Sequence, residues 1–192
     1  MERSNEDLMK AYQSGETHAM EQLFQRYKVR ILNFCYGLLA NRADAEEAAA
    51  DAFLALVIEK DSFDTSRTFS TWFYTIARNK CISRMRKRNN FVSLWIPSSN
   101  DDDGKMWDVP DGNDISREAM AKKEVQVGVR KAIAKLPDEQ REAIILRQYH
   151  GFSYQQVSQI LGCSQEKVKS LIFRAKEQLR AELMSFVKEE RS

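Results

Sequence analysis

The sequence has 192 residues, of which 43% are hydrophobic, so the chain can bury one large core or two small ones. Its formal net charge of +2 is too small to indicate nucleic-acid binding by itself, and its three cysteines lack the spacing of a disulfide framework or a zinc site. The charged first residues and the absence of an apolar run of about 18 residues predict a soluble, cytoplasmic protein without a signal peptide or membrane span.

The composition favours an all-helical fold. The chain has only seven glycines and three prolines, whereas residues that favour helix are abundant. The first predicted helix begins near Ser4, which together with Asp7 has the spacing of a capping box. The second, residues 17–39, places seven apolar or aromatic side chains on one stripe between Met20 and Leu38.

The third predicted helix, residues 43–58, has two distinct faces. Its alanines lie on one side with two larger apolar residues, and Asp44, Glu47 and Asp51 lie along another. Three acids at these spacings predict an exposed acidic ridge.

The fourth predicted helix, residues 70–88, is aromatic in its first half and basic in its second, with six basic residues and no acid in segment 78–88. Stacking surface followed by phosphate-attracting charge is a combination that holds unstacked single-stranded bases. Trp72 and Phe73 are expected to serve mainly in folding. Phe63, in the preceding loop, is the better candidate for a base contact.

A connector separates this part from the rest of the chain. Residues 89–114 hold six aspartates against a single lysine, together with two prolines and two glycines, which is the turn chemistry of a linker. We therefore expect a helical domain at 1–90, a flexible acidic linker at 91–115 and a second helical domain at 116–192.

The second domain has the pattern of a helix-turn-helix. A helix over residues 116–136 is stopped by Pro137, which suits the first turn of the next helix, and two more helices follow. Ser153 opens a capping box, Gly162 terminates one helix and Ser164 can cap the last. The short turn between the last two helices is typical of the motif, which spans residues 153–183.

The last helix is the candidate duplex reader. Four apolar residues from Val168 to Leu179 are expected to be buried, and the remaining side chains face outward: Gln165, Glu166, Lys167, Lys169, Ser170, Phe173, Arg174 and Lys176. The basic residues can meet phosphates, and side chains near the helix start can reach base edges in the major groove. The alternative is a solvated surface of an amphipathic helix.

Four segments carry a family resemblance: GETHAMEQLFQRY, DAEEAAADAFLAL, DSFDTSRTFSTWFYTIARN with its basic continuation, and LPDEQREAIILRQYHGFSYQQVSQILGCSQEKVKSLIFRAKEQLR. In order and spacing they resemble extracytoplasmic-function sigma factors of the sigma-70 family. The resemblance covers nearly the whole chain outside the linker, and the four motifs together are far more specific than any one of them.

The resemblance implies a factor that binds core RNA polymerase and directs it to promoters. Asp44, Glu47 and Asp51 would dock on the clamp helices of the beta-prime subunit, and the second domain would meet the beta flap. The resemblance further implies capture of the melted −10 strand by the fourth helix and its loop, with Phe63 and Asn79 in a base pocket and Arg78, Lys80, Arg84, Arg86, Lys87 and Arg88 along the backbone.

The helix-turn-helix would read the −35 duplex. By motif position its contacts are Ser164, Gln165, Lys167, Lys169, Ser170, Leu171 and Arg174. The acidic linker either threads toward the polymerase active-site cleft or serves as a solvated tether. The resemblance also implies control by an anti-sigma factor, and it implies no cofactor, no metal and no small-molecule substrate.

The sequence departs from the family pattern at three positions. The usual Gln-Glu pair of the core-binding helix is Ala50-Asp51, a usual threonine is Lys167, and a common arginine is Leu171. Leucine can contact a thymine methyl but cannot make the bidentate guanine contact of arginine. The −35 sequence recognised is therefore expected to differ from the common one.

Two other classes of function are weaker. A stand-alone helix-turn-helix regulator would explain the second domain but would leave the aromatic and basic fourth helix without a role. An enzyme is disfavoured because the only histidines, His18 and His150, lack a triad arrangement, and neither a Gly-rich phosphate loop nor an H-E-x-x-H motif occurs.

Overall fold

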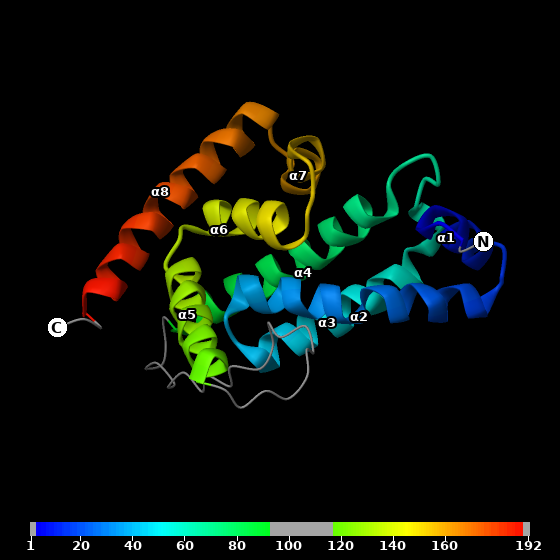
Figure 1. Cartoon of the computed structure of the whole chain (residues 1–192). Helices are drawn as coiled ribbons and strands as arrows, with labels where there is room; N and C mark the ends of the chain where they lie inside the picture. The colour runs from blue at the N-terminus through cyan, green and yellow to red at the C-terminus, as the bar shows by residue number, and fades with distance from the viewer. Residues whose placement is uncertain (1–2, 93–116, 190–192) are drawn as a thin grey trace.

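The computed structural model describes residues 3–92 and 117–189, and all regular secondary structure within these ranges is helical (Figure 1). The all-helical prediction is therefore confirmed for this part of the chain. The predicted linker, residues 91–115, lies outside the described residues from 93 onward.

The first domain contains four α-helices and one short 3-10 helix: α1 (Asn5–Gln13), α2 (Thr17–Leu39), α3 (Arg42–Ile58), η1 (Lys60–Ser62) and α4 (Phe69–Val92). The predicted bounds agree closely except at the end of α4, which continues four residues beyond position 88. Ser4 caps α1 by accepting a hydrogen bond from the Asp7 amide at 3.0 Å, and Asn41 caps α3 through the Asp44 amide at 2.9 Å. These caps satisfy amides that have no partner within the helix.

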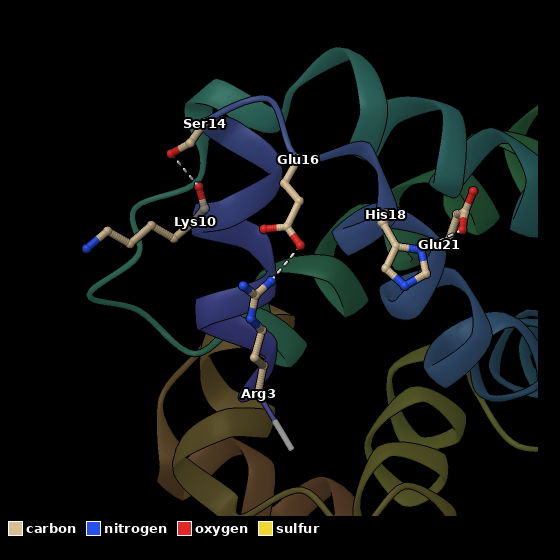
Figure 2. A network of polar contacts seen from close by, with 6 residues as sticks. All are labelled: Arg3, Lys10, Ser14, Glu16, His18 and Glu21. Atoms are coloured by element: carbon tan, nitrogen blue, oxygen red, sulfur yellow. Dashed lines mark hydrogen bonds and ion pairs between the residues drawn. The ribbon is translucent and has the colours of Figure 1, made fainter. Parts of the chain in front are cut away.

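Exposed polar contacts lie at both ends of α1 and at the start of α2 (Figure 2). Arg3 pairs with Glu16 at 2.7 Å, and the Ser14 hydroxyl donates to the Lys10 carbonyl at 3.0 Å. Exposed ion pairs add little stability. The position of α1 is therefore set mainly by Leu8 and Met9, whose side chains are fully buried.

The second domain contains α5 (Arg117–Ala134), α6 (Asp138–Ile144), the π-helix η2 (Ile145–Tyr149), α7 (Tyr154–Leu161) and α8 (Gln165–Glu189). The predicted capping box at Ser153 is confirmed, because its hydroxyl accepts from the Gln156 amide while the Gln156 side chain accepts from the Ser153 amide. Gly162 ends α7 with a φ of 67°, a left-handed conformation that glycine adopts without strain. No local pattern predicts the π-helix η2.

Helix α4 lies between the two halves of the molecule. Figure 1 shows it with α2 and α3 on one side and with α6 and α7 on the other. Phe69 and Phe73 of α4 are fully buried, as is Phe34 of α2. The buried side chains of both domains form one continuous cluster around this helix.

Polar contacts cross the interface between the domains. The Arg78 guanidinium of α4 donates through Nε to Glu142 Oε2 of α6 at 2.7 Å, and the glutamate side chain is only 4% exposed. The Tyr74 hydroxyl and His150 Nδ1 are hydrogen-bonded at 2.8 Å. Arg141 donates to the Leu38 carbonyl at the end of α2 at 3.0 Å. Since charged side chains are rarely buried without a partner, these contacts fix how the domains meet.

Burial perturbs two titratable groups at this interface. Burial, with a smaller contribution from the charge of Arg30, lowers the pKa of His150 to about 4. Burial raises the pKa of Glu142, although the hydrogen bond and charge of Arg78 act in the opposite direction. The interface between the domains therefore contains a neutral imidazole at neutral pH.

We predict that acid lowers the free energy of unfolding through His150. Between about pH 6.5 and 4 the unfolded chain binds a proton that the folded chain excludes, so the free energy of unfolding falls by about 1.4 kcal/mol per pH unit. Above pH 6.5 the contribution is fully present, and below about pH 4 no further loss occurs through this group. Glu142 acts in the opposite direction, because its raised pKa favours protonation in the folded state.

Urea unfolding at a series of pH values measures this slope. His150→Gln should flatten it, whereas His18→Gln should leave it unchanged, because His18 lies on the surface with its side chain 70% exposed. An equal slope in the wild type and in His150→Gln would contradict the assignment.

Candidate nucleic-acid and protein interfaces

The aromatic first half of α4 belongs to the core. Phe73 is fully buried, and Tyr74 is 2% exposed. Trp72 is partly buried and packs against the same cluster. The interpretation that Trp72 and Phe73 serve mainly in folding is therefore confirmed.

Phe63 lies in the exposed loop between η1 and α4, as expected, but its side chain is buried. Its side chain is 4% exposed and packs against Trp72 at a centroid distance of 5.0 Å and against Phe69 at 5.7 Å. The neighbouring carbonyls are also held, because Gln13 donates to the carbonyls of Lys60 and Phe63. Burial is favourable for an aromatic side chain, and in this structure the Phe63 ring is not available to the predicted base contact.

The basic half of α4 divides into exposed side chains and side chains paired with carboxylates. Asn79, Arg86, Lys87 and Arg88 are exposed, and Lys80 is half-buried. Arg78 and Arg84 are instead bound by carboxylates on opposite neighbours of α4, Glu142 on α6 and the acidic ridge on α3. Part of the predicted −10 surface is therefore exposed to solvent, and the two arginines in the rest of it are paired with carboxylates of the protein.

The acidic ridge of α3 lies against α4. Glu47 and Asp51 have side chains 65% and 49% exposed, and Asp44 is half-buried near the start of the helix. Arg84 contacts Glu47 and donates a 2.9 Å hydrogen bond to Asp51 Oδ2. Burial lowers the pKa of Arg84, but the bonds and charges of Asp51 and Glu47 outweigh burial and raise the pKa above its usual value.

This contact joins two residue sets that the sequence analysis treated separately. Arg84 is predicted to contact DNA, whereas its partners Glu47 and Asp51 are predicted to contact another protein. No pattern within either helix signals the contact, because it depends on how α3 and α4 pack.

Exposed apolar side chains continue the acidic ridge along α3. Leu54 and Ile58 follow Asp51 at steps of three and four residues, which places them on the same face. They are 57% and 71% exposed, and Val57 beside them is 41% exposed. Their sequence positions, out of phase with the buried alanine side of the helix, are the signal from which this extension could have been predicted. Large apolar groups held on a surface are typical of contacts with other proteins.

The start of α8 presents the expected polar surface. The Ser164 hydroxyl accepts from the Lys167 amide at 3.2 Å and caps the helix. The side chains of five predicted contacts beyond the cap are exposed: Gln165, Lys167, Lys169, Ser170 and Arg174. Lys167 is paired with Glu139 of α6 at 2.7 Å, and this bond raises its pKa. Phe173 is 66% exposed, as its place in the pattern predicted.

Leu171 differs from the other members of this set. Its side chain is 8% exposed and belongs to the buried cluster, together with Val168 and Ile172. The predicted exposed position is wrong because the leucine lies beside the apolar stripe of α8, where burial is favourable. In this structure it is not available to a thymine methyl.

Sites of other kinds are not indicated in the described ranges. No cluster of three histidine, cysteine or acidic side chains there is placed to hold a metal ion. His18 pairs with Glu21 on an exposed surface, and Cys35 and Cys81 are buried free thiols. None of the helices in the described part is both long and apolar enough to cross a bilayer.

Comparisons with known proteins match both halves of the chain. The family described as Sigma-70 region 2 matches residues 23–91, and the family described as Sigma-70, region 4 matches residues 127–179. The ECF RNA polymerase sigma factor SigW of Bacillus subtilis is 32% identical over 185 residues, which cover 95% of this chain and 98% of the relative. These relatives are transcription initiation factors and not enzymes.

Solved structures show the same fold. CnrH, solved with the cytosolic domain of CnrY, aligns with a TM-score of 0.70 at 23% identity and covers 95% of this chain and 99% of its own. The sigma factor RpoE, solved with the anti-sigma factor NepR from Bartonella quintana, aligns with a TM-score of 0.67 at 27% identity and covers 85% and 96%. Two helical domains, the paired region 2 and region 4 matches and the full-length similarity to SigW lead to one conclusion: the chain belongs to the extracytoplasmic-function RNA polymerase sigma factors of the sigma-70 family.

Proposed function

We propose that this sigma factor acts in the cytoplasm and divides promoter recognition between three surfaces. The domain at residues 1–90 binds core polymerase through α3 and the melted −10 strand through α4. The domain at 116–192 binds the −35 duplex through α8, and the acidic segment 91–115 connects them. The observation that supports this division is that α3, α4 and α8 each carry exposed charged side chains within a segment that matches a sigma-70 region.

The proposed polymerase surface is the acidic ridge of α3. Asp44, Glu47 and Asp51 carry negative charge toward the beta-prime clamp helices, where complementary charge speeds association and orients the partner. Leu54 and Ile58 add exposed apolar area beside this ridge. An interface of this kind combines a water-excluding apolar part with charged contacts at its edge.

The proposed −10 surface is the basic half of α4. We assign the exposed Asn79 to a base turned out of the stack and Lys80, Arg86, Lys87 and Arg88, which are exposed or half-buried, to the strand backbone. Arg78 and Arg84 join them once they leave their carboxylate partners. The proposed −35 surface consists of Ser164, Gln165, Lys167, Lys169, Ser170 and Arg174, on the same domain that meets the beta flap.

We further propose that an anti-sigma factor controls this protein. The similar sigma factor RpoE was solved in complex with the anti-sigma factor NepR. The apolar stripe on α3 is a surface that such a partner can cover while it blocks the neighbouring acidic ridge. Co-purification from cells that express candidate partners tests this proposal.

Reconstitution with core polymerase tests the function as a whole. The purified protein should not open promoter DNA alone, and it should support specific initiation once core enzyme is added. Selection of initiating promoters from genomic DNA then identifies the −10 and −35 sequences. Failure to bind core enzyme, or tight operator binding without it, would exclude the proposal.

We predict that Glu47→Lys or Asp51→Lys weakens binding to core polymerase by about tenfold, because each change reverses a charge on the proposed docking ridge. Titration against fluorescently labelled core enzyme measures the effect. Glu46→Lys is the matched control, since Glu46 is an exposed acid on the same helix that pairs with Arg42. Equal losses in all three variants would show that the overall charge of α3 matters and not this ridge.

We also predict that Lys169→Ala and Arg174→Ala reduce affinity for a duplex that carries the −35 element and lower the salt dependence by about one unit per lost phosphate contact. Fluorescence anisotropy at several salt concentrations measures both quantities, with a promoter transcribed by the reconstituted enzyme as the probe. Lys131→Ala removes the same charge from an exposed site on α5 and should leave both unchanged. Unaltered binding by the first two variants would refute the assignment of α8.

A further inference from the structure

The segment that joins α3 to α4 is held at its start by the last turn of α1. The Gln13 side chain donates to the Lys60 carbonyl at 2.7 Å and to the Phe63 carbonyl at 2.9 Å. A side-chain amide has two N–H donors, so both bonds form together. The Lys60 ammonium also lies over the Tyr12 ring, 5.0 Å from its centroid. Two neighbouring side chains of α1 therefore fix the beginning of this segment.

The end of the same segment is held by the first turn of α1. The Glu6 carboxylate accepts a hydrogen bond from the Phe69 amide at 2.8 Å, across 63 positions in the sequence. Phe69 is the first residue of α4, and the first amides of a helix have no partner within it. A carboxylate is also favoured at this end by the helix dipole. Helix α1 therefore caps α4 as well as holding the segment that precedes it.

Helix α1 is itself firmly anchored. The side chains of Leu8 and Met9 are fully buried. Asn5 donates to the Tyr27 hydroxyl at 2.9 Å, and the Tyr27 ring packs against Phe69 at a centroid distance of 5.2 Å. The helix packs against α2, η1 and α4 (Figure 1). Its polar contacts to the segment before α4 therefore start from a fixed support.

The tip of the segment, between these anchors, is polar and exposed. The Ser66 amide donates to Asp64 Oδ1 at 3.0 Å, and the Arg67 amide donates to the Asp64 carbonyl at 2.9 Å, so the tip forms a defined turn. Hydroxyl, carboxylate and guanidinium groups can together read the Watson–Crick edge of an unstacked base. All five side chains of the tip are exposed: Asp64, Thr65, Ser66, Arg67 and Thr68.

We infer that α1 is the support of a −10 reading loop, residues 60–68, and that Gln13 and Glu6 are its positioning residues. This inference rests on the proposed function, in which α4 binds the melted −10 strand, and on the loop before α4 belonging to that surface. Neither residue touches DNA. Each holds one end of the loop, so that the exposed tip keeps the shape that fits one base. Recognition needs geometry held within about 0.5 Å, so a loop released at one end accepts several bases.

A positioning role differs from a contribution to stability in what it changes. Two promoters that differ at one −10 base are transcribed by the same holoenzyme at two rates. The ratio of these rates does not depend on how much active holoenzyme is present. Loss of folded protein alone therefore leaves the ratio unchanged, whereas a misplaced loop lowers it.

The experiment uses full-length variants combined with core polymerase. Gln13→Leu removes both bonds to the loop carbonyls at similar side-chain size. Glu6→Leu removes the acceptor for the Phe69 amide, whereas Glu6→Gln keeps an oxygen that can accept this bond. Gln25→Leu is the matched control, because Gln25 is an exposed glutamine on the neighbouring helix α2. Thermal unfolding followed by circular dichroism verifies that each variant is folded.

The probe is a promoter that the wild-type holoenzyme transcribes, together with every single-base change across its −10 segment. We expect Gln13→Leu to lower the preference for the favoured base by about tenfold at one −10 position, and Glu6→Leu to lower it by a smaller factor. Glu6→Gln and Gln25→Leu should keep the wild-type preference. Base changes in the −35 element should have the same effect on all the proteins. Hydrogen exchange should become faster in both Glu6→Leu and Gln13→Leu at the amides of residues 60–69.

The outcomes separate positioning from stability and from the function itself. Wild-type base preference in folded Gln13→Leu and Glu6→Leu would overturn the positioning role, even with faster exchange in the loop. An equal loss of transcription from every promoter would also overturn it. If Gln13→Leu does not fold, the two Glu6 variants decide: a preference lost in Glu6→Leu and kept in Glu6→Gln supports the role, and equal preferences contradict it. A wild-type holoenzyme without preference at any −10 base would instead overturn the proposed −10 surface.

Discussion

Helix α4 must be buried on two sides at once, and the rest of the structure depends on this constraint. Its fully buried rings, Phe69 and Phe73, pack among the helices of the first domain, and Tyr74 reaches the second. Burial of large aromatic side chains supplies much of the stability of a small helical domain. Because one helix supplies both contacts, the position of the second domain is coupled to the helix that is proposed to contact the −10 strand.

The charges of α4 follow the same division. Arg84 is held by the acidic ridge of α3, and Arg78 is held by Glu142 of α6. Each arginine thus has a protein carboxylate where the proposed complex offers a DNA phosphate. Arg86, Lys87 and Arg88 remain exposed beyond these pairs and give the helix end its positive charge. That end can attract the strand before the paired arginines are released.

The sequence predicts helices, caps and the turn of the helix-turn-helix well, because these depend on neighbours within a few residues. Ser153, Gly162 and Ser164 act as their positions indicate. Contacts between distant segments leave no such local pattern. The Arg78–Glu142 pair joins residues 64 positions apart, and the burial of Phe63 depends on Trp72 and Phe69. The exposed position predicted for Leu171 is wrong for a related reason, because a helical stripe has no sharp edge.

The contacts between the domains differ in what they contribute to the interface. A buried ion pair gains little over water, since desolvation cancels most of the attraction, so the Arg78–Glu142 pair specifies the arrangement more than it stabilises it. The net attraction comes from the rings of Tyr74, His150 and Phe152. The two domains are therefore held together mainly by buried ring contacts, and the ion pair sets how they meet.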